Sequence, residues 1–198
     1  RKKMKYDVMI IGSGPGGYVA AVRAAQLGFN TAVVERENLG GICLNWGCIP
    51  TKALLKSAQA FNYIKHSETY GVKIEGSFKP DMNAIVERSR TVAANMGKGV
   101  AHLMQKNNIT VIEGEARLTK DRKVSVEMKD GSGTQVFEAD HIILATGARS
   151  RNLPNMPQDG KKIIGYREAM TLREQPESMV VVGSGAIGSE FAHFCQSI

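Results

Sequence analysis

The chain alternates short apolar runs with longer amphipathic stretches, and their order predicts a mixed α/β fold. Residues 6–11 and 31–35 are mostly apolar or β-branched and predict two buried strands. The alanine-rich stretch between them, residues 18–27, predicts a helix that stops at Gly28. A strand, a helix and a second strand in this order predict a β-α-β unit with parallel strands.

The middle of the chain predicts two long helices and then a group of short strands. Residues 43–66 should be helical, with Pro50 tolerated only in the first turn, and Asp81 should cap a second helix that runs to about residue 106. A Gly-Ser-Gly turn at 131–133 indicates an antiparallel hairpin or meander, and residues 146–163 resemble a loop. The expected strands are residues 109–113, 123–128, 135–139 and 141–145.

A strand, a glycine loop and a helix are predicted a second time, at residues 179–198. No strand follows this second copy, so we expect the chain to be a fragment of a longer protein. Half of a β-α-β unit cannot bury its own apolar faces. The face of the last helix formed by Ile187, Phe191 and Phe194 should therefore pack onto a partner chain or be poorly ordered.

The first glycine loop, residues 12–17, fits the pattern G-x-G-x-x-G between a strand and a helix. Gly12 should permit the tight turn, Gly14 should let the backbone approach a pyrophosphate, and Gly17 should allow close helix–strand packing. Glu35, at the end of the next strand, has the spacing of an acid that accepts ribose hydroxyls. The pattern predicts dinucleotide binding but does not choose between FAD and NAD.

Cys43 and Cys48 lie in one short segment after this unit, and three interpretations compete. A zinc site would need two further ligands at suitable spacing, which Cys195 and the histidines do not supply as a pair. Inert buried thiols are the second interpretation, and a redox-active pair is the one we favour. On an ideal helix residues five apart are separated by about 8–9 Å at Cα. A disulfide needs less than about 7 Å, so the segment should be distorted, which Gly47 makes inexpensive.

Composition narrows the class of protein further. The 198 residues carry a net charge of +7, but the basic residues are dispersed, and we expect neither nucleic-acid binding nor membrane insertion. We expect no secretory signal, because a glycine loop begins where the apolar part of a signal would have to continue. Three cysteines do not make a secreted disulfide framework, so catalytic thiols in an intracellular protein fit better.

Residues 40–52, with the sequence GGICLNWGCIPTK, resemble the active-site segment of the flavoprotein disulfide reductases, and within them the lipoamide branch. The cysteine motif is highly specific and the glycine loops less so, and the resemblance covers essentially the whole chain. Residues 145–147 resemble the second FAD contact of the family, and residues 113–116 resemble the segment whose backbone touches the adenine.

The resemblance implies a role for each reactive side chain. Cys48 would face the flavin, and Cys43 would exchange with the substrate dithiol. Lys52 would lie near the flavin N5 and pair with Glu190, while Glu35 would hold the FAD ribose. The other implied cofactor contacts are Gly12, Ser13, Gly14, Pro15, Gly16, Gly17, Arg36, Gly40, Gly41, Gly114, Glu115, Ala116, Ala145, Thr146, Gly147, Gly183, Gly185 and Gly188.

The resemblance also implies a Rossmann-like fold and an activity. Residues 1–150 would form the FAD domain, 151–178 a connection, and 179–198 the start of an NAD domain. The whole enzyme would be a homodimer that oxidises the dihydrolipoyl domains of 2-oxoacid dehydrogenase or glycine-cleavage complexes and reduces NAD⁺ through a Cys43–Cys48 disulfide. It would work in the bacterial cytoplasm, or in the mitochondrial matrix of a eukaryote, and it would use no metal.

One part of the family's machinery has no match in this chain. The acid-base histidine of the family belongs to a C-terminal domain, so the chain alone should not complete the reaction. None of the four histidines matches that motif, and His193 and Cys195 should be packing residues. Two alternatives stay open: a glutathione- or mercuric-reductase type of flavoprotein, and an FAD-binding module without turnover. The four histidines are His66, His102, His141 and His193.

Overall fold

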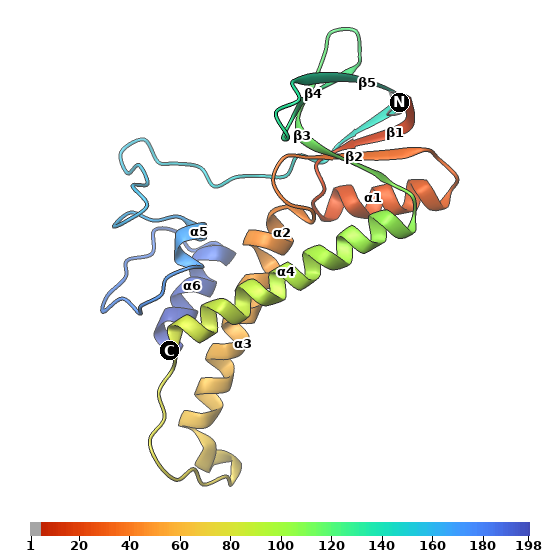
Figure 1. Cartoon of the computed structure of the whole chain (residues 1–198). Helices are drawn as coiled ribbons and strands as arrows, with labels where there is room; N and C mark the ends of the chain where they lie inside the picture. The colour runs from red at the N-terminus through yellow and green to blue at the C-terminus, as the bar shows by residue number, and fades with distance from the viewer. Residues whose placement is uncertain (1–4) are drawn as a thin grey trace. The chain divides into compact units, whose positions relative to one another are not determined.

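The computed structural model describes residues 5–198, which fall into two compact units (Figure 1). The first unit consists of the chain up to Asn45 together with Ala94–Arg149. The second unit consists of Trp46–Ala93 and Ser150–Ile198. The chain thus passes from the first unit to the second between Cys43 and Cys48.

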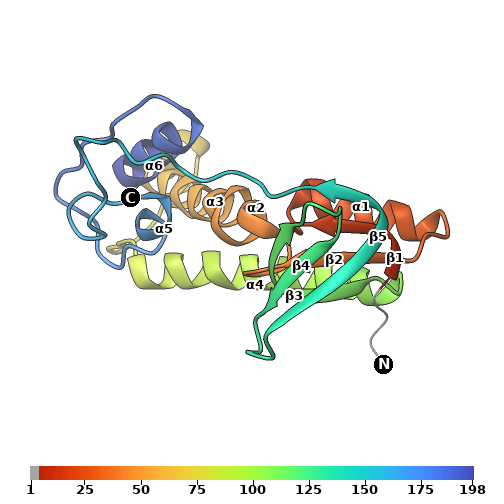
Figure 2. The same ribbon diagram turned by 90° about the horizontal axis from the view of Figure 1, so that it is seen from above.

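Five strands of the first unit close into a barrel (Figures 1 and 2). Its parallel part has the order β3-β2-β1-β5, and its antiparallel part is the meander β3-β4-β5. Both the parallel sheet and the antiparallel insertion predicted from the sequence are therefore confirmed. The strands are β1 (Lys5–Ile11), β2 (Thr31–Glu35), β3 (Thr110–Leu118), β4 (Val124–Met128) and β5 (Thr134–Leu144).

The prediction of separate strands at 135–139 and 141–145 is wrong, because β5 runs unbroken through Asp140. Its first part pairs with β4 and its second part with β1. Asp140 does not interrupt the strand, since its exposed carboxylate forms an ion pair with Lys5 at 3.2 Å. The strand changes its partner between Phe137 and Glu138, before it reaches Asp140.

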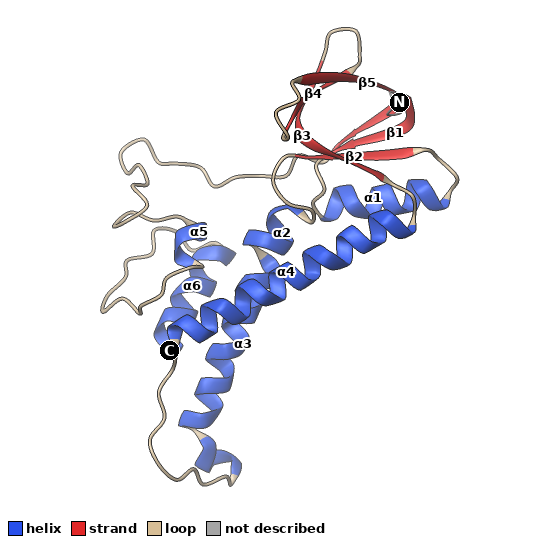
Figure 3. Cartoon of the chain, viewed as in Figure 1, coloured by secondary structure: helices blue, strands red, loops and turns tan. Residues whose placement is uncertain are grey.

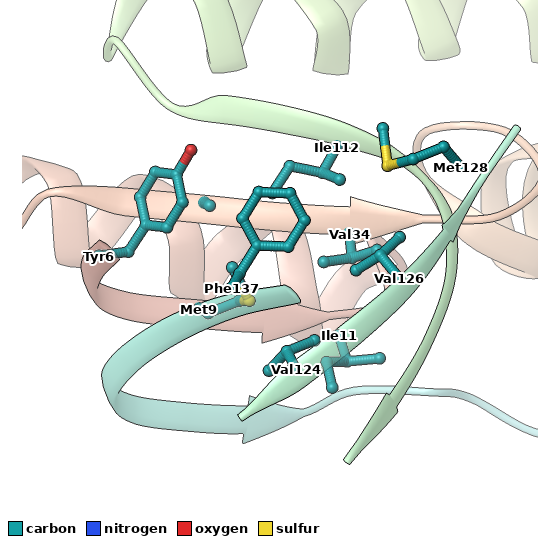
Figure 4. Close-up of a cluster of buried hydrophobic side chains, with 10 residues drawn as sticks. Tyr6, Met9, Ile11, Val34, Ile112, Val124, Val126, Met128 and Phe137 are labelled. Carbon is teal, nitrogen blue, oxygen red and sulfur yellow. The ribbon is translucent and has the colours of Figure 1, made fainter. Parts of the chain in front are cut away.

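The barrel interior is filled by alternate residues of its strands (Figure 4). In β4 every second side chain points inward, as the two-residue period of a strand requires. Phe137 is 1% exposed and packs at 6.4 Å from the ring of Tyr6. The buried members of this core are Tyr6, Met9, Ile11, Ala32, Val34, Ile112, Val124, Val126, Met128 and Phe137.

Helix α1 (Pro15–Gln26) contacts β1 and β2 and buries Ala21 completely. It begins three residues earlier than predicted, because Pro15 already has the backbone angle of a first helical residue. It ends before Gly28, whose φ of +89° is the left-handed conformation typical of a helix stop.

Two helices replace the single helix predicted for residues 43–66. They are α2 (Gly41–Trp46) and α3 (Cys48–Lys65), and Gly47 interrupts them with φ −144° and ψ −119° (Figure 3). The expected distortion between the cysteines is therefore present, at the glycine. Pro50 lies in the first turn of α3, where its missing N–H costs no helical hydrogen bond.

The predicted cap of the second long helix is confirmed. Helix α4 (Met82–Lys106) begins after Asp81, whose Oδ1 accepts a hydrogen bond from the Ala84 N–H at 3.0 Å. This bond satisfies one of the N–H groups that a helix start leaves without an intrahelical partner.

The core of the second unit corrects the prediction for the last helix. That helix, α6 (Ala186–Ser197), contacts α3 and buries Phe191 and Phe194, which are 5% and 3% exposed. Only Ile187 stays exposed, at 58%. Cys195 packs against the core as expected, whereas His193 is exposed and the prediction that it packs is wrong. The core consists of Leu54, Ala58, Val86, Met170, Phe191, Phe194 and Ile198, and two short elements that were not predicted complete the unit, η1 (Ser67–Tyr70) and α5 (Tyr166–Ala169).

The strand predicted at residues 179–182 does not form. A strand is stabilised by hydrogen bonds to a neighbouring strand, and all five strands of the described residues belong to the first unit. Val180 and Val182 are consequently 89% and 62% exposed.

Candidate functional site

Two glycines of the first loop are required by packing within the chain. Gly12 follows β1 with φ +98°, and its N–H donates to the Val34 carbonyl at 2.8 Å. A Cβ on Gly12 would lie 2.3 Å from the Ala145 carbonyl oxygen, and a Cβ on Gly17 would lie 1.9 Å from the Gly12 carbonyl oxygen. Neither position has space for a side chain: Gly17 allows α1 to lie close to the end of β1, and Gly12 allows the residues after β5 to lie close to the loop.

Packing within the chain does not require a glycine at the other two positions of the loop, Gly14 and Gly16. A Cβ added at either would meet nothing within 4 Å. Gly14 is the N-cap of α1 and offers no side chain to its first turn. The loop therefore leaves an open approach to the positive end of a helix, which is the geometry that binds phosphate groups.

Glu35 is held against this loop by Ser13. The Ser13 N–H and Oγ donate to Glu35 Oε2 at 3.0 and 2.6 Å, and the Glu37 N–H donates to Oε1 at 2.8 Å. Ser13 is completely buried, and Glu35 is half-buried. A carboxylate has about four acceptor positions. Three bonds position the group while it retains capacity for a hydroxyl donor.

The start of the cysteine segment lies against the same loop. The Gly40 N–H donates to the Ser13 carbonyl at 3.1 Å and approaches Ser13 Oγ at 3.2 Å. Gly41 has φ +60°, and a Cβ there would lie 2.7 Å from the Gly14 Cα. Gly41 is therefore needed for the segment to approach the loop, and the Gly40 N–H bonds the segment to it.

Cys43 lies on α2 and is half-buried. The next side chain, Leu44, is buried, and the Asn45 amide donates to the carbonyls of Leu39 and Gly41 at 2.9 Å each. Burial on one side and a double hydrogen bond on the other fix this helix although it has only six residues.

Residues 145–147, which were predicted to contact the cofactor, lie beside the first loop. The Ala145 N–H donates to the Ile11 carbonyl at 2.8 Å, which keeps residues 145–147 beside the first loop. Gly147 has φ +72° and open space around it, and Thr146 is exposed.

Gly114 has a packing role in β3. A Cβ there would lie 2.4 Å from the Glu127 carbonyl oxygen, so the close pairing of β3 with β4 explains this glycine. Ala116 packs against the barrel core, while Glu115 and Arg36 are exposed.

In the second unit Cys48 is the first residue of α3 and is exposed. A sulfur at a helix start experiences the positive end of the helix dipole. Lys52 lies one turn further on and forms an ion pair with Glu190 of α6. Their side chains are 62% and 31% exposed, so solvent screens this pair.

The second glycine loop repeats the conformation of the first. Gly183 has φ +113°, and Gly185 caps α6 with φ −71° and ψ 170°, close to the −61° and −179° of Gly14. A Cβ on Gly188 would lie 2.9 Å from the Gly183 carbonyl oxygen, the same relation that Gly17 has to Gly12. The loop forms although the preceding strand does not.

One arrangement near the cysteines was not predicted. The ring of Trp46 is contacted by two guanidinium groups, Arg90 at 4.2 Å and Arg167 at 5.0 Å from the ring centroid. Burial lowers the pKa of the Arg90 guanidinium below its ordinary value. The available signal was the single tryptophan inside the cysteine segment, but nothing in the sequence indicated its distant partners.

Residues 5–198 contain no group of three or more His, Cys, Asp or Glu side chains arranged to hold a metal ion. None of the helices in that range is both long and apolar enough to span a bilayer.

Comparisons with known proteins point in one direction. The sequence profile of the family described as pyridine nucleotide-disulphide oxidoreductase matches residues 6–198. Dihydrolipoyl dehydrogenase from Rhizobium etli is 53% identical and is matched over 98% of this chain and 43% of its own length. The enzyme of the same name from Chlorobaculum tepidum is 52% identical over 96% of this chain and 40% of its own.

A solved structure agrees. The crystal structure of LpdA from Mycobacterium tuberculosis superposes with a TM-score of 0.85 at 27% identity, over 96% of this chain and 42% of that one. The chain therefore spans about two fifths of the length of these relatives.

Proposed function

The chain belongs to the pyridine nucleotide-disulphide oxidoreductase family and is a homologue of dihydrolipoyl dehydrogenases, and on that premise we propose that it is the FAD-binding, thiol-bearing part of an enzyme that oxidises protein-bound dihydrolipoamide with NAD⁺. The observation that carries this proposal is the first glycine loop. Gly14 and Gly16 are open there, beside a fixed carboxylate, and a cysteine pair follows directly.

The residues present fit FAD. The start of α1 with Gly14 and Gly16 would accept the pyrophosphate, and Glu35 would accept the ribose hydroxyls. Residues 145–147 lie beside this loop and would complete the site. When bound, FAD would supply the transfer of an electron pair between the dithiol and NAD⁺.

The cysteines would perform thiol–disulfide exchange. A thiolate of dihydrolipoamide attacks the Cys43 sulfur, which breaks the Cys43–Cys48 bond and leaves a thiolate at Cys48. The second substrate thiolate then attacks the substrate sulfur of the mixed disulfide and releases Cys43. The substrate dithiol is oxidised to a disulfide, and the two cysteines gain its electron pair.

The start of α3 supports the charge that this exchange creates. Cys48 occupies the first position of the helix, where a negative sulfur is favoured. Lys52 adds a positive charge one turn away, and its ion pair with Glu190 limits where that charge can lie. We propose that Lys52 supplies a positive charge beside the thiols and that Glu190 holds this charge in place.

Thiol mapping tests the proposal. The oxidised chain is treated with dihydrolipoamide, quenched with acid, alkylated and analysed by mass spectrometry. We expect a Cys43–Cys48 disulfide that opens with dihydrolipoamide, unchanged behaviour in Cys195→Ser, and no such disulfide in Cys43→Ser or Cys48→Ser. A wild-type chain that never forms this disulfide refutes the proposed role of the pair.

Cofactor binding is tested separately. FAD is added, and the chain is passed through a gel-filtration column. Flavin absorbance should elute with the protein. Faster opening of the disulfide by glutathione than by dihydrolipoamide would instead favour the glutathione-reductase type. We do not expect NAD⁺ reduction by this chain alone, because the resemblance assigns the acid-base histidine to a further domain.

A further inference from the structure

We propose that the Ser13 hydroxyl is a positioning group that holds the Glu35 carboxylate ready for a ribose hydroxyl of FAD. This inference rests on the proposed function, which assigns the ribose to Glu35. Ser13 is completely buried, so its side chain would act through the carboxylate rather than by contact with the cofactor.

Two donors of Ser13 converge on one oxygen of Glu35. The Ser13 Oγ donates to Glu35 Oε2 at 2.6 Å, and the Ser13 N–H donates to the same oxygen at 3.0 Å. A length of about 2.5–2.7 Å is typical of a hydroxyl bonded to a carboxylate, and such bonds are about twice as strong as bonds between neutral groups. The hydroxyl therefore contributes one of the stronger bonds that hold this carboxylate.

The donor direction of this hydroxyl is fixed by a second partner. The buried Gly40 N–H approaches Ser13 Oγ at 3.2 Å, and an N–H can only donate. A carboxylate can only accept, so the single hydroxyl hydrogen points to Glu35 while the oxygen accepts from Gly40. Because all three residues belong to the first unit, Ser13 is held on both sides within that unit.

The burial of Glu35 does not by itself require this bond. Glu35 is half-buried, so water can reach the carboxylate and satisfy it without the Ser13 hydroxyl. The hydroxyl therefore determines where the carboxylate points rather than compensating a buried charge. Glu35 Oε1 accepts from the Glu37 N–H at 2.8 Å and, with two acceptor positions on each oxygen, has room for a further donor.

A carboxylate that is already in place binds a ligand at a lower cost. Ordering one flexible side chain on binding costs free energy that corresponds to about three- to tenfold in affinity. Without the hydroxyl, Glu35 would visit more rotamers in the free chain and would have to be ordered when FAD binds. The backbone N–H groups of residues 13 and 37 would still contact it, so we expect a partial loss of affinity.

The test compares two flavins that differ only at the adenosine ribose. The full chain is titrated with FAD and with an FAD analogue whose adenosine ribose lacks both hydroxyl groups, and the change in flavin fluorescence gives both dissociation constants. A hydrogen bond to a charged group corresponds to about tenfold or more in affinity. The wild-type chain should therefore prefer FAD to the analogue by about tenfold or more.

Ser13→Ala should reduce this preference by about three- to tenfold, while the affinity for the analogue stays within about twofold of the wild type. Glu35→Gln should reduce the preference as well, because it removes the carboxylate. Adding Ser13→Ala to Glu35→Gln should then change the preference by less than about twofold, since the two residues act through one group.

Ser89 supplies a matched control in the second unit. It is also a completely buried serine, and its Oγ donates to the Val86 carbonyl at 2.7 Å. Ser89→Ala removes a buried hydrogen bond of similar length but should leave the preference for FAD within about twofold of the wild type. Ser13→Gly removes the Ser13 hydroxyl without adding bulk and decides the matter if Ser13→Ala loses its helical circular dichroism.

The outcomes separate this inference from the proposed function. A folded Ser13→Ala chain that keeps the wild-type preference overturns the role of Ser13 and leaves the proposed function intact. An equal loss of affinity for both flavins also overturns that role, because the hydroxyl would then only support the loop, as does a similar loss of preference in Ser89→Ala. A wild-type chain that binds neither flavin, or binds both equally, overturns the assignment of the ribose to Glu35 in the proposed function itself.

Discussion

Gly14 and Gly17 belong to the same loop, but the structure gives them opposite roles, which a pair of alanine substitutions separates. Gly14 has φ −61° and ψ −179°, a conformation that alanine adopts, and a Cβ there meets nothing within 4 Å. Gly14→Ala should therefore change the free energy of unfolding by less than about 1 kcal/mol, because alanine restricts the unfolded chain but is a poorer N-cap than glycine.

Gly14→Ala should weaken the binding of FAD although it leaves the chain stable. The added methyl group projects into the open approach at the start of α1, which we assign to the pyrophosphate. Losing one hydrogen bond to a charged group costs about 1.5–3 kcal/mol, which corresponds to about 10- to 150-fold weaker binding. Gly14→Ala should therefore be a stable protein with impaired cofactor binding.

Gly17→Ala should fail for a different reason. Its Cβ would lie 1.9 Å from the Gly12 carbonyl oxygen, whereas ordinary contacts between such atoms need about 3.5 Å or more. Helix α1 would have to move away from β1 against backbone atoms, at a cost of about 3 kcal/mol or more.

Urea unfolding followed by circular dichroism and quenching of FAD fluorescence measure the two effects separately. The reasoning is refuted if Gly14→Ala is destabilised as strongly as Gly17→Ala. It is also refuted if a folded Gly14→Ala chain binds FAD as tightly as the wild type.

Three further predictions follow from burial. Phe191→Ala should lower the free energy of unfolding by about 3–5 kcal/mol, while the exposed Ile187→Ala should change it by less than about 0.5 kcal/mol; equal effects in urea unfolding would contradict the described core. Glu190→Gln should change the free energy of unfolding by less than about 1 kcal/mol, since the ion pair of Glu190 with Lys52 is screened by solvent. The same variant should slow thiol–disulfide exchange with dihydrolipoamide. An unchanged exchange rate would refute the role proposed for Glu190. Burial raises the pKa of the Cys195 thiol, so its alkylation by iodoacetamide should reach half of its maximal rate at a higher pH in the folded chain than in urea, and a coincident or lower midpoint would count against this.

Local patterns in the sequence were sufficient for much of the first unit. Gly28 and Asp81 mark helix ends through their own backbone or side chain, and both predictions are confirmed. Gly17 is likewise required by the Gly12 carbonyl, which lies close in sequence. Such features depend on short-range physics, which a single sequence displays directly.

Features that depend on distant partners were missed. The continuity of β5 through Asp140 depends on β1 and β4, which pair with its two parts. The burial of Phe194 depends on α3, and the contacts of Trp46 depend on residues far along the chain. The error at residues 179–182 has the same origin, because a strand requires a neighbour that its own sequence does not specify.

The second glycine loop adopts its turn and starts its helix while the residues before it remain unpaired. Its geometry therefore does not need a completed sheet, and Gly183, Gly185 and Gly188 keep their conformation on a helix that packs against α3. During synthesis on the ribosome, such a loop can take its final shape before the strands around it have all emerged. For the same reason, we expect the turn to be kept if residues 183–188 are grafted onto the start of another helix.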